Sequence, residues 1–229
     1  MVLVAGDRSA PGISEALAQL CRTYWYPLYA FSRRNGLSPH DAADVTQSFF
    51  AHLFEKEALR KVDRAKGKFR SFLLASLKNF LHNQWEKDKA QKRGGCCKIV
   101  SLDELSAEQR YQNEPAEHSS AEQLYDLQWA VALVTAVMEE LRTQYAQAGK
   151  TALFEALEPC LTGEVPDGRL AEIGARLAVN PNTLRSYLHR LRREEFGPLL
   201  RQQVRDTLAN PTEDEVREEI RHLFATIGT

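Results

Sequence analysis

Apolar residues recur three and four positions apart along almost the whole chain, and this spacing constrains the fold more than any other feature. It is the period of an α-helix that buries one side. Alternation at every second position with β-branched residues, which is typical of strands, is hardly visible. We therefore predict an all-α protein, and the sequence contains no internal repeat or low-complexity tract.

The first hundred residues predict three helices. The first runs over residues 13–35, contains Pro27 as a potential kink or break, and ends at Gly36. The second spans residues 38–55, where Ser38 and Asp41 form a capping box. Its apolar arc is formed by Ala42, Val45, Phe49 and Leu53. The polar side carries no Lys or Arg. It consists of Asp41, Asp44, Gln47, Ser48 and Glu55.

The third helix begins near Phe69 and runs toward Gly94 and Gly95, which mark the end of a first domain. Leu73, Leu77 and Phe80 form its expected buried stripe. The opposite side gathers Ser71, Lys78, His82, Trp85 and Lys89. A Trp among cations suits stacking on unpaired bases. The alternative is a Trp at the edge of the core beside a solvated charged face.

Charge is segregated along the chain although the net charge is only -1. Residues 60–93 hold eleven Lys and Arg against three acids, and residues 169–205 hold eight Arg against three acids. Between these blocks, residues 101–128 hold seven acids and one Arg. Two basic blocks favour two places where a polyanion is held, because Lys and Arg supply most of the affinity for nucleic acid. Two ordinary basic surfaces are the alternative.

Residues 170–195, LAEIGARLAVNPNTLRSYLHRLRREE, predict a helix-turn-helix. Gly174, Ala178 and Leu184 supply the small and apolar residues that two closely crossing helices require. Asn180 can cap the second helix and Pro181 can begin it, which leaves backbone N–H groups free at its start. Its polar side gathers hydrogen-bonding side chains in the manner of a major-groove reader. An ordinary solvated helical hairpin is the alternative.

The expected organisation is two helical domains, the second containing the helix-turn-helix, joined by an acidic linker. The first domain spans residues 1–95, the linker 96–120, the second domain 121–205 and an acidic tail 206–229. A long helix from about Ala121 should bury Leu124, Leu127, Val131, Val134, Met138 and Leu141. The tail either shields the DNA-reading helix or is a solvated helix.

Several function classes find no support in the sequence. The four cysteines lack metal or disulfide spacing, there is no phosphate-cradling glycine loop, and no nucleophile has a paired base. We therefore expect no enzyme, no catalytic residue, no metal and no cofactor. No segment approaches the length of a membrane span or a signal peptide, so we expect a cytoplasmic protein without a membrane partner.

Three segments together resemble one family, the extracytoplasmic-function type of bacterial RNA polymerase sigma factor. DAADVTQSFFAHLF is similar to its region-two helix, FRSFLLASLKNFLHNQWEKDKAQKR to its promoter-melting helix, and LAEIGARLAVNPNTLRSYLHRLRREE to its region four. The resemblance covers most of residues 13–95 and 121–200. Ser48 departs from the usual Glu and Ala178 from the usual turn Gly. The segment LRTQYAQAGKTALFEALEPCLTGE is longer than in the compact members of the family, which is compatible with a divergent branch.

The resemblance implies partners and sites. The first domain would bind the clamp helices of the largest subunit of core RNA polymerase and the second its flap region, and an anti-sigma factor is a further partner class. Asp44 and Gln47 match the polymerase-binding pair. Contacts with the minus-10 element of promoter DNA would come from Arg70, Lys78, Asn79, His82, Trp85 and Lys89. Contacts with the minus-35 element would come from Asn182, Thr183, Arg185, Ser186, His189, Arg190 and Arg193.

The leading hypothesis is thus a sigma factor that directs promoter-specific transcription initiation. The alternative is a stand-alone helix-turn-helix transcriptional regulator that binds duplex DNA without polymerase. This alternative explains residues 170–195 equally well, but it leaves Asp44, Gln47 and the basic helix without a role.

Overall fold

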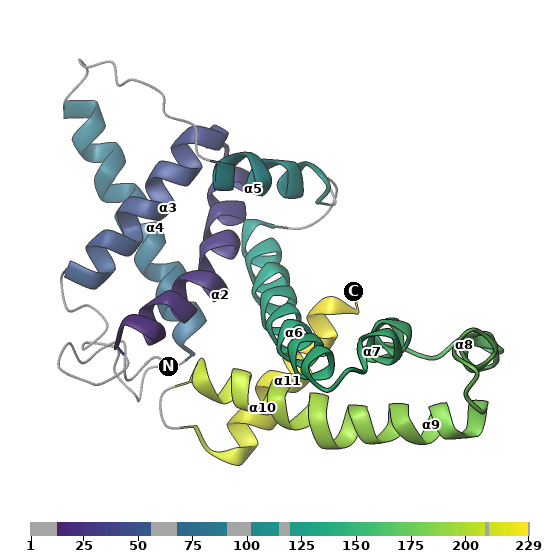
Figure 1. Ribbon diagram of the computed structural model, residues 1–229. Helices are drawn as coiled ribbons and strands as arrows, with labels where there is room; N and C mark the ends of the chain where they lie inside the picture. The colour runs from purple at the N-terminus through teal and green to yellow at the C-terminus, as the bar shows by residue number, and fades with distance from the viewer. Residues whose placement is uncertain (1–12, 56–67, 91–101, 115–119, 209–210, 229) are drawn as a thin grey trace. The chain divides into compact units, whose positions relative to one another are not determined.

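The computed structural model describes residues 13–55, 68–90, 102–114, 120–208 and 211–228, without the side chains of residues 13, 14, 55, 84–90 and 102–105. Every regular element in these ranges is a helix, so the prediction of an all-α protein is confirmed (Figure 1). Contacts between Cα atoms divide the chain into two compact units. Unit 1 comprises residues 1–132 and 205–229, and unit 2 comprises residues 133–204.

Unit 1 is built around three helices close to their predicted bounds. They are α2 (Ile13–Arg34), α3 (Pro39–Glu55) and α4 (Phe69–Ala90). Helix α2 continues through the buried Pro27, so the predicted division at that residue does not occur. The chain turns at Gly36, whose φ of +91° is a left-handed conformation that glycine adopts without a steric cost. Helix α3 then packs against α2.

The predicted apolar arc of α3 lies in the core. Phe49 and Leu53 are almost fully buried, and the Phe49 ring lies 5.8 Å from that of Phe80 on α4. Burying such a side chain contributes about 1.5–3 kcal/mol. At the start of α3, Ser38 Oγ accepts a hydrogen bond from the Asp41 N–H at 3.2 Å and donates to its carboxylate at 2.6 Å. The rotation of α3 that leaves its acid-bearing side outward is therefore fixed by packing and capping.

Helix α5 (Leu102–Gln112) forms within the predicted linker and packs against α2 and α3. The Glu108 carboxylate accepts hydrogen bonds from Arg33 Nε at 2.8 Å, Arg33 Nη2 at 2.9 Å and the Tyr29 hydroxyl at 2.7 Å. These three donors tie α5 to α2. The middle of the predicted linker is thus a helix that belongs to unit 1.

The C-terminal stretch is also a packed element. Helix α11 (Glu213–Ile227) belongs to unit 1 and buries Val216, Glu219 and Leu223. Its N-terminus carries a capping box, in which the Thr212 hydroxyl accepts from the Glu215 N–H and the Glu215 carboxylate accepts from the Thr212 N–H. The predicted tail therefore contains a helix with one buried side. The predicted boundary after residue 205 lies within one residue of the end of unit 2 at Val204.

Helix α6 (Ala121–Gln147) begins in unit 1 and continues into unit 2. Leu124 and Leu141 are buried as predicted, whereas Leu127, Val131, Val134 and Met138 are only partly buried. The buried apolar positions between the two ends are Tyr125, Trp129, Ala130, Leu133 and Val137. Because α6 is apolar on more than one side, its sequence alone did not fix which side faces the core.

The remaining helices of unit 2 lead to a long helical run. They are α7 (Thr151–Leu157), the 3-10 turn η2 (Glu158–Cys160), α8 (Arg169–Leu177), α9 (Pro181–Arg190), the π-helical turn η3 (Leu191–Phe196) and α10 (Gly197–Asp206), whose last two residues belong to unit 1. Helix α8 packs against α9, and α9 against η3. Ile173, Leu184, Leu188 and Leu191 are buried there, while Leu170 and Leu177 are partly exposed.

Candidate nucleic-acid interface

The turn between α8 and α9 depends on two small residues. A Cβ on Gly174 would lie 2.6 Å from the backbone oxygen of Val179, closer than such atoms approach. Ala178 ends α8 in the left-handed region, at φ 52° and ψ 39°, and the Val179 N–H donates to the Gly174 oxygen at 3.0 Å. The small residues predicted at positions 174 and 178 therefore occupy the two places where the backbones come closest and turn most sharply.

The start of α9 has the predicted cap. The Asn180 side chain accepts a hydrogen bond from the Asn182 N–H at 2.9 Å, and Pro181 is the first helical residue. Proline fits this position because it needs no acceptor there. The first turn of a helix presents unsatisfied N–H groups and the positive end of its dipole, a combination that favours a phosphate.

All seven residues predicted to contact the minus-35 element are exposed, namely Asn182, Thr183, Arg185, Ser186, His189, Arg190 and Arg193. Several of them are already held in place on the helix. Arg185 donates to the Asn182 side-chain oxygen at 3.3 Å, and the Ser186 hydroxyl donates to the Asn182 backbone oxygen at 3.2 Å. The Arg190 guanidinium lies 5.1 Å from the centre of the Tyr187 ring. Bidentate donors and small hydroxyls of this kind read base edges in a groove.

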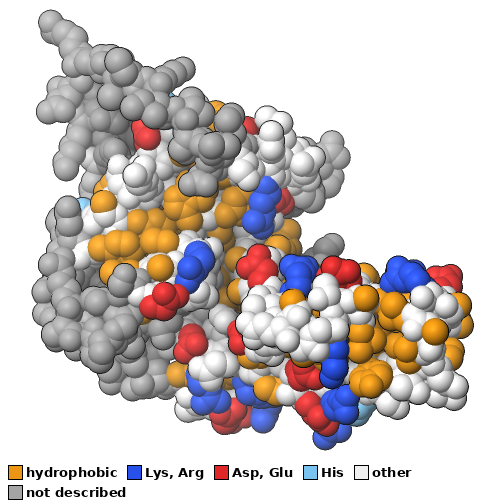
Figure 2. Space-filling model, viewed as in Figure 1, with side chains coloured by type: hydrophobic (Ala, Val, Ile, Leu, Met, Phe, Trp, Pro, Cys, Tyr) orange, Lys and Arg blue, Asp and Glu red, His pale blue; other side chains and the backbone are white. Residues whose placement is uncertain are grey.

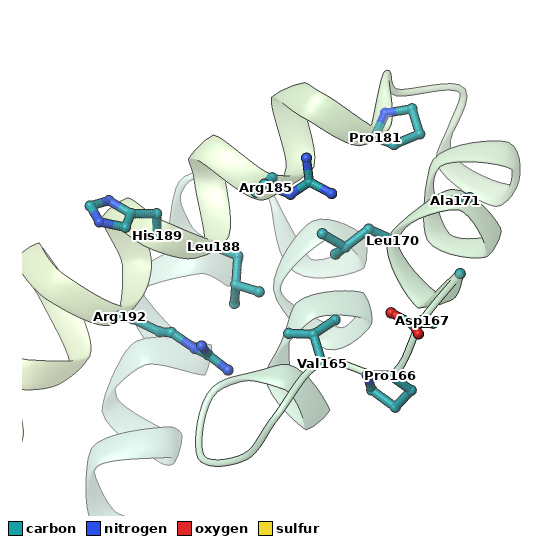
Figure 3. A pocket seen from close by; sticks show the side chains of 11 residues that line it. Val165, Pro166, Asp167, Leu170, Ala171, Pro181, Arg185, Leu188, His189 and Arg192 are labelled. Carbon is teal, nitrogen blue, oxygen red and sulfur yellow. The ribbon is translucent and has the colours of Figure 1, made fainter.

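A hollow separates α9 from the segment that leads into α8 (Figure 3). Val165, Asp167, Leu170, Arg185 and Arg192 are among its lining residues. Figure 3 shows Arg185 and Arg192 extending from the α9 side toward that segment.

Arg192 has a structural role that sequence reasoning missed. Its Nε donates to the Cys160 backbone oxygen at 3.0 Å, and its Nη2 donates to the backbone oxygens of Cys160 and Gly163. It thereby holds the segment after η2 against the helical run. The sequence signal for this role was the position of Arg192 directly after the apolar Leu191, at the edge of the apolar side of the helical run. In the structure Leu191 is buried and Arg192 is only partly exposed.

The π-helical turn changes the geometry after Arg190. A π turn contains more residues than an α turn, so positions beyond it rotate relative to a projection at 100° per residue. Arg193 is exposed but lies in this turn, outside the regular face of α9. At the same turn the Tyr145 hydroxyl donates to Glu195 at 3.1 Å. Burial, followed by the Glu195 charge, raises the pKa of Tyr145 to about 12, so the hydroxyl remains a donor at neutral pH.

Cations and carboxylates are interspersed over unit 2 on the side seen in Figure 2. This view contains no continuous basic surface over the part of unit 2 that it shows. On this side, therefore, no basic surface extends over the whole of unit 2 as seen, and the basic residues of α9 are distinguished by their grouping on one capped helix.

The predicted polymerase-binding pair is available on unit 1. Asp44 and Gln47 are both exposed on α3, with Ser48 exposed beside them. Asp44 Oδ2 lies 3.6 Å from Nε2 of His40, one helical turn earlier. Fixed cations are absent from the described polar side of α3, which leaves this acid accessible to a cationic partner.

One predicted DNA-contact residue of α4, Arg70, is enclosed by other side chains. The Arg70 side chain is only 8% exposed, and its guanidinium meets Asp126 Oδ1 and Glu219 Oε1, each at 2.8 Å. It also lies 4.7 Å from the centre of the Trp129 ring. Arg70 is therefore not an exposed cation in this structure, because two carboxylates and an aromatic ring already surround it.

The other predicted residues of α4 differ in their surroundings. Lys78 Nζ lies 2.6 Å from Glu122 Oε1 but remains about half exposed. Asn79 and His82 are exposed. The side chains of Trp85 and Lys89 lie outside the described residues. Asn79 and His82 are thus the predicted minus-10 residues that the described part of α4 presents openly.

No group of three or more His, Cys, Asp or Glu side chains in the described residues could hold a metal ion. No described helix is long and apolar enough to cross a membrane. Comparisons of the chain with protein-family models, with curated proteins and with solved structures found no match.

Proposed function

We propose that this protein is a promoter-specificity subunit of bacterial RNA polymerase, of the extracytoplasmic-function sigma type. It performs no covalent chemistry and needs no cofactor. It contributes recognition of promoter DNA and capture of the melted strand to the polymerase, which supplies the active site. Its place of action is the cytoplasm.

The observation that carries the proposal is the grouping of polar side chains on α9. Leu184 and Leu188 face the core while Asn182, Arg185 and His189 are exposed, and the helix begins with a capped N-terminus. An exposed helix with this arrangement can enter the major groove and place its first turns against base edges. In the proposed function this helix reads the minus-35 element.

Polymerase docking is assigned to Asp44 and Gln47. Their exposure supports this role, because neither side chain is needed to bury the apolar arc of α3. A carboxylate and an amide on a side without fixed cations suit a basic protein surface such as the clamp helices of the largest subunit. The flap region would contact the second unit, and an anti-sigma factor would regulate access to these surfaces.

Capture of the minus-10 element is assigned to the exposed residues of α4. Asn79 and His82 can hydrogen-bond to bases that have left the stack, and Lys78 can reach a phosphate if it leaves Glu122. Trp85 and Lys89 would extend this surface by stacking and by charge.

A stand-alone regulator that binds duplex DNA without polymerase is the second candidate. The ion pairs of Arg70 and Lys78 favour it, because they leave fewer free cations on the described part of α4 than the sequence suggests. Both candidates use α9 in the same way. They differ in whether the Asp44 and Gln47 side has a partner.

DNA reading is tested by selecting duplexes from a random pool with the full-length protein and repeating the selection with Arg185→Ala. We expect relaxed preference at one base position and a loss of about 1–3 kcal/mol there. Arg217→Ala is the matched control, since Arg217 is an exposed arginine of α11 paired with Asp214. An equal loss on every sequence would make Arg185 a phosphate contact, and failure to select any sequence would remove the proposed reading role.

A further inference from the structure

The start of α4 is covered by α11 through a buried ion-pair cluster within unit 1. Glu219 is 1% exposed, and its two carboxylate oxygens separate two cations: Oε2 lies 2.5 Å from Lys68 Nζ, and Oε1 lies 2.8 Å from Arg70 Nε. Asp126 on α6 binds the other side of the Arg70 guanidinium. Glu219 is thus the single group of α11 that neutralises both cations.

A carboxylate between two such cations occupies the position of a phosphate. Arg and Lys bind both anions with the same donors, and the planar guanidinium forms comparable hydrogen bonds with either. Lys68 is still 37% exposed, so the cluster is open to solvent on the lysine side. A nucleic-acid phosphate that displaced Glu219 would find Lys68 and Arg70 already arranged around it.

The attachment of α11 is limited enough for displacement. Only Val216, Glu219 and Leu223 are buried among its fifteen residues, and one of these three is charged. In its last turn Phe224 and Ile227 are each 38% exposed. Burial of an ionised carboxylate is favourable only while its partners are in place. Transfer of Lys68 and Arg70 to a phosphate would therefore remove the compensation that keeps Glu219 buried.

We propose that α11 is a displaceable cover, whose Glu219 holds in the free protein the place that a nucleic-acid phosphate takes on Lys68 and Arg70. This inference rests on the proposed function only in taking the polyanion to be DNA. It gives Arg70 a role in DNA binding that depends on the departure of α11, and it makes DNA binding by unit 1 and docking of α11 mutually exclusive.

The test compares two full-length variants that differ by one position and carry the same charge change, Glu219→Gln and Glu218→Gln. Glu218 is exposed on the same helix. Affinity for a single-stranded oligonucleotide of random sequence is measured over a range of salt concentrations. We expect Glu219→Gln to bind on the order of tenfold more tightly at low salt than Glu218→Gln. The slope of the logarithm of the binding constant against the logarithm of the salt concentration should steepen by about 0.7 for each released cation, roughly 1.4 for two.

Lys68→Ala in the Glu219→Gln background should abolish the gain. Equal affinities and slopes for the two Gln variants would overturn the inference, and so would a gain that survives Lys68→Ala. These outcomes leave the proposed function intact, because duplex selection through Arg185 does not involve α11. Conversely, loss of duplex selection with a normal response of Glu219→Gln would refute the reading role alone.

Hydrogen exchange of the unmodified protein provides a second measurement that does not depend on the folding of a variant. With saturating oligonucleotide, the amides of residues 213–227 should exchange faster than in the free protein. Unchanged or slower exchange of α11 in the bound protein would contradict displacement.

Discussion

The backbone oxygen of Val179 lies 2.6 Å from the position that a Cβ on Gly174 would occupy. This approach joins the last turn of α8 to the residues that precede α9, and it therefore sets the angle at which α9 leaves the turn. Any side chain at position 174 must move the backbone, because the opposing atom belongs to the main chain and not to a flexible side chain.

Gly174→Ala should lower the free energy of unfolding of unit 2 by about 2 kcal/mol, the usual cost of inserting a methyl group into a packed contact. The measurement is urea unfolding followed by circular dichroism. Gly163→Ala is the control, since a Cβ there would meet no atom within 4 Å. Equal unfolding free energies for the two variants would show that the turn tolerates a wider separation than the structure indicates.

Ala178→Gly should raise the free energy of unfolding by about 1 kcal/mol. Ala178 is the one described residue other than glycine with a positive φ, and the left-handed conformation costs a residue with a Cβ about 1–2 kcal/mol. The greater freedom of glycine in the unfolded chain offsets part of this gain. The same substitution at the exposed helical Ala175 should instead cost about 1 kcal/mol. A loss at both positions would refute the assigned strain at Ala178.

The ion pair between Arg33 and Glu108 should make the stability of unit 1 depend on pH. Hydrogen bonds from Arg33 hold the pKa of Glu108 below its ordinary value of 4.5, against the opposing effect of burial. A carboxyl with a lowered folded-state pKa stabilises the fold fully above its ordinary value, and this contribution is lost as the pH falls through the folded-state pKa. The loss of stability on acidification is therefore expected below pH 4.5.

Glu108→Gln isolates this contribution, because the amide resembles the protonated acid in shape. The difference in unfolding free energy between the unmodified protein and the variant should be largest near neutral pH and should shrink below pH 4.5. A difference that stays constant through that range would mean that Glu108 does not stabilise the fold through its charge.

Particular residues show where sequence reasoning succeeds and where it stops. The rotation of α3 was predicted because one narrow apolar arc, including Phe49 and Leu53, leaves a single way to bury it. The cap of α9 was predicted because Asn180 and Pro181 act on their own neighbours. Both features depend on local chemistry, which a sequence window contains.

The surroundings of Arg70 depend on distant parts of the chain and were not predictable in the same way. Its partners Asp126 and Glu219 lie on α6 and α11, far along the sequence. A projection of α4 alone counts Arg70 as one more cation of a basic block. Similarly, Glu108 looks like one of many acids in a polar linker until α2 brings Arg33 and Tyr29 to it.

The central claim is that the protein works as part of RNA polymerase, and it is tested most directly with purified core polymerase. The full-length protein, Asp44→Ala and Gln47→Ala are compared for complex formation and for initiation from a promoter that carries the duplex sequence selected by the protein. Thermal unfolding serves as the control, because both side chains are exposed and should leave the midpoint nearly unchanged. We predict a stable complex and promoter-dependent initiation with the unmodified protein, and weaker complexes with both variants. Tight binding to duplex DNA without any polymerase complex would contradict the claim.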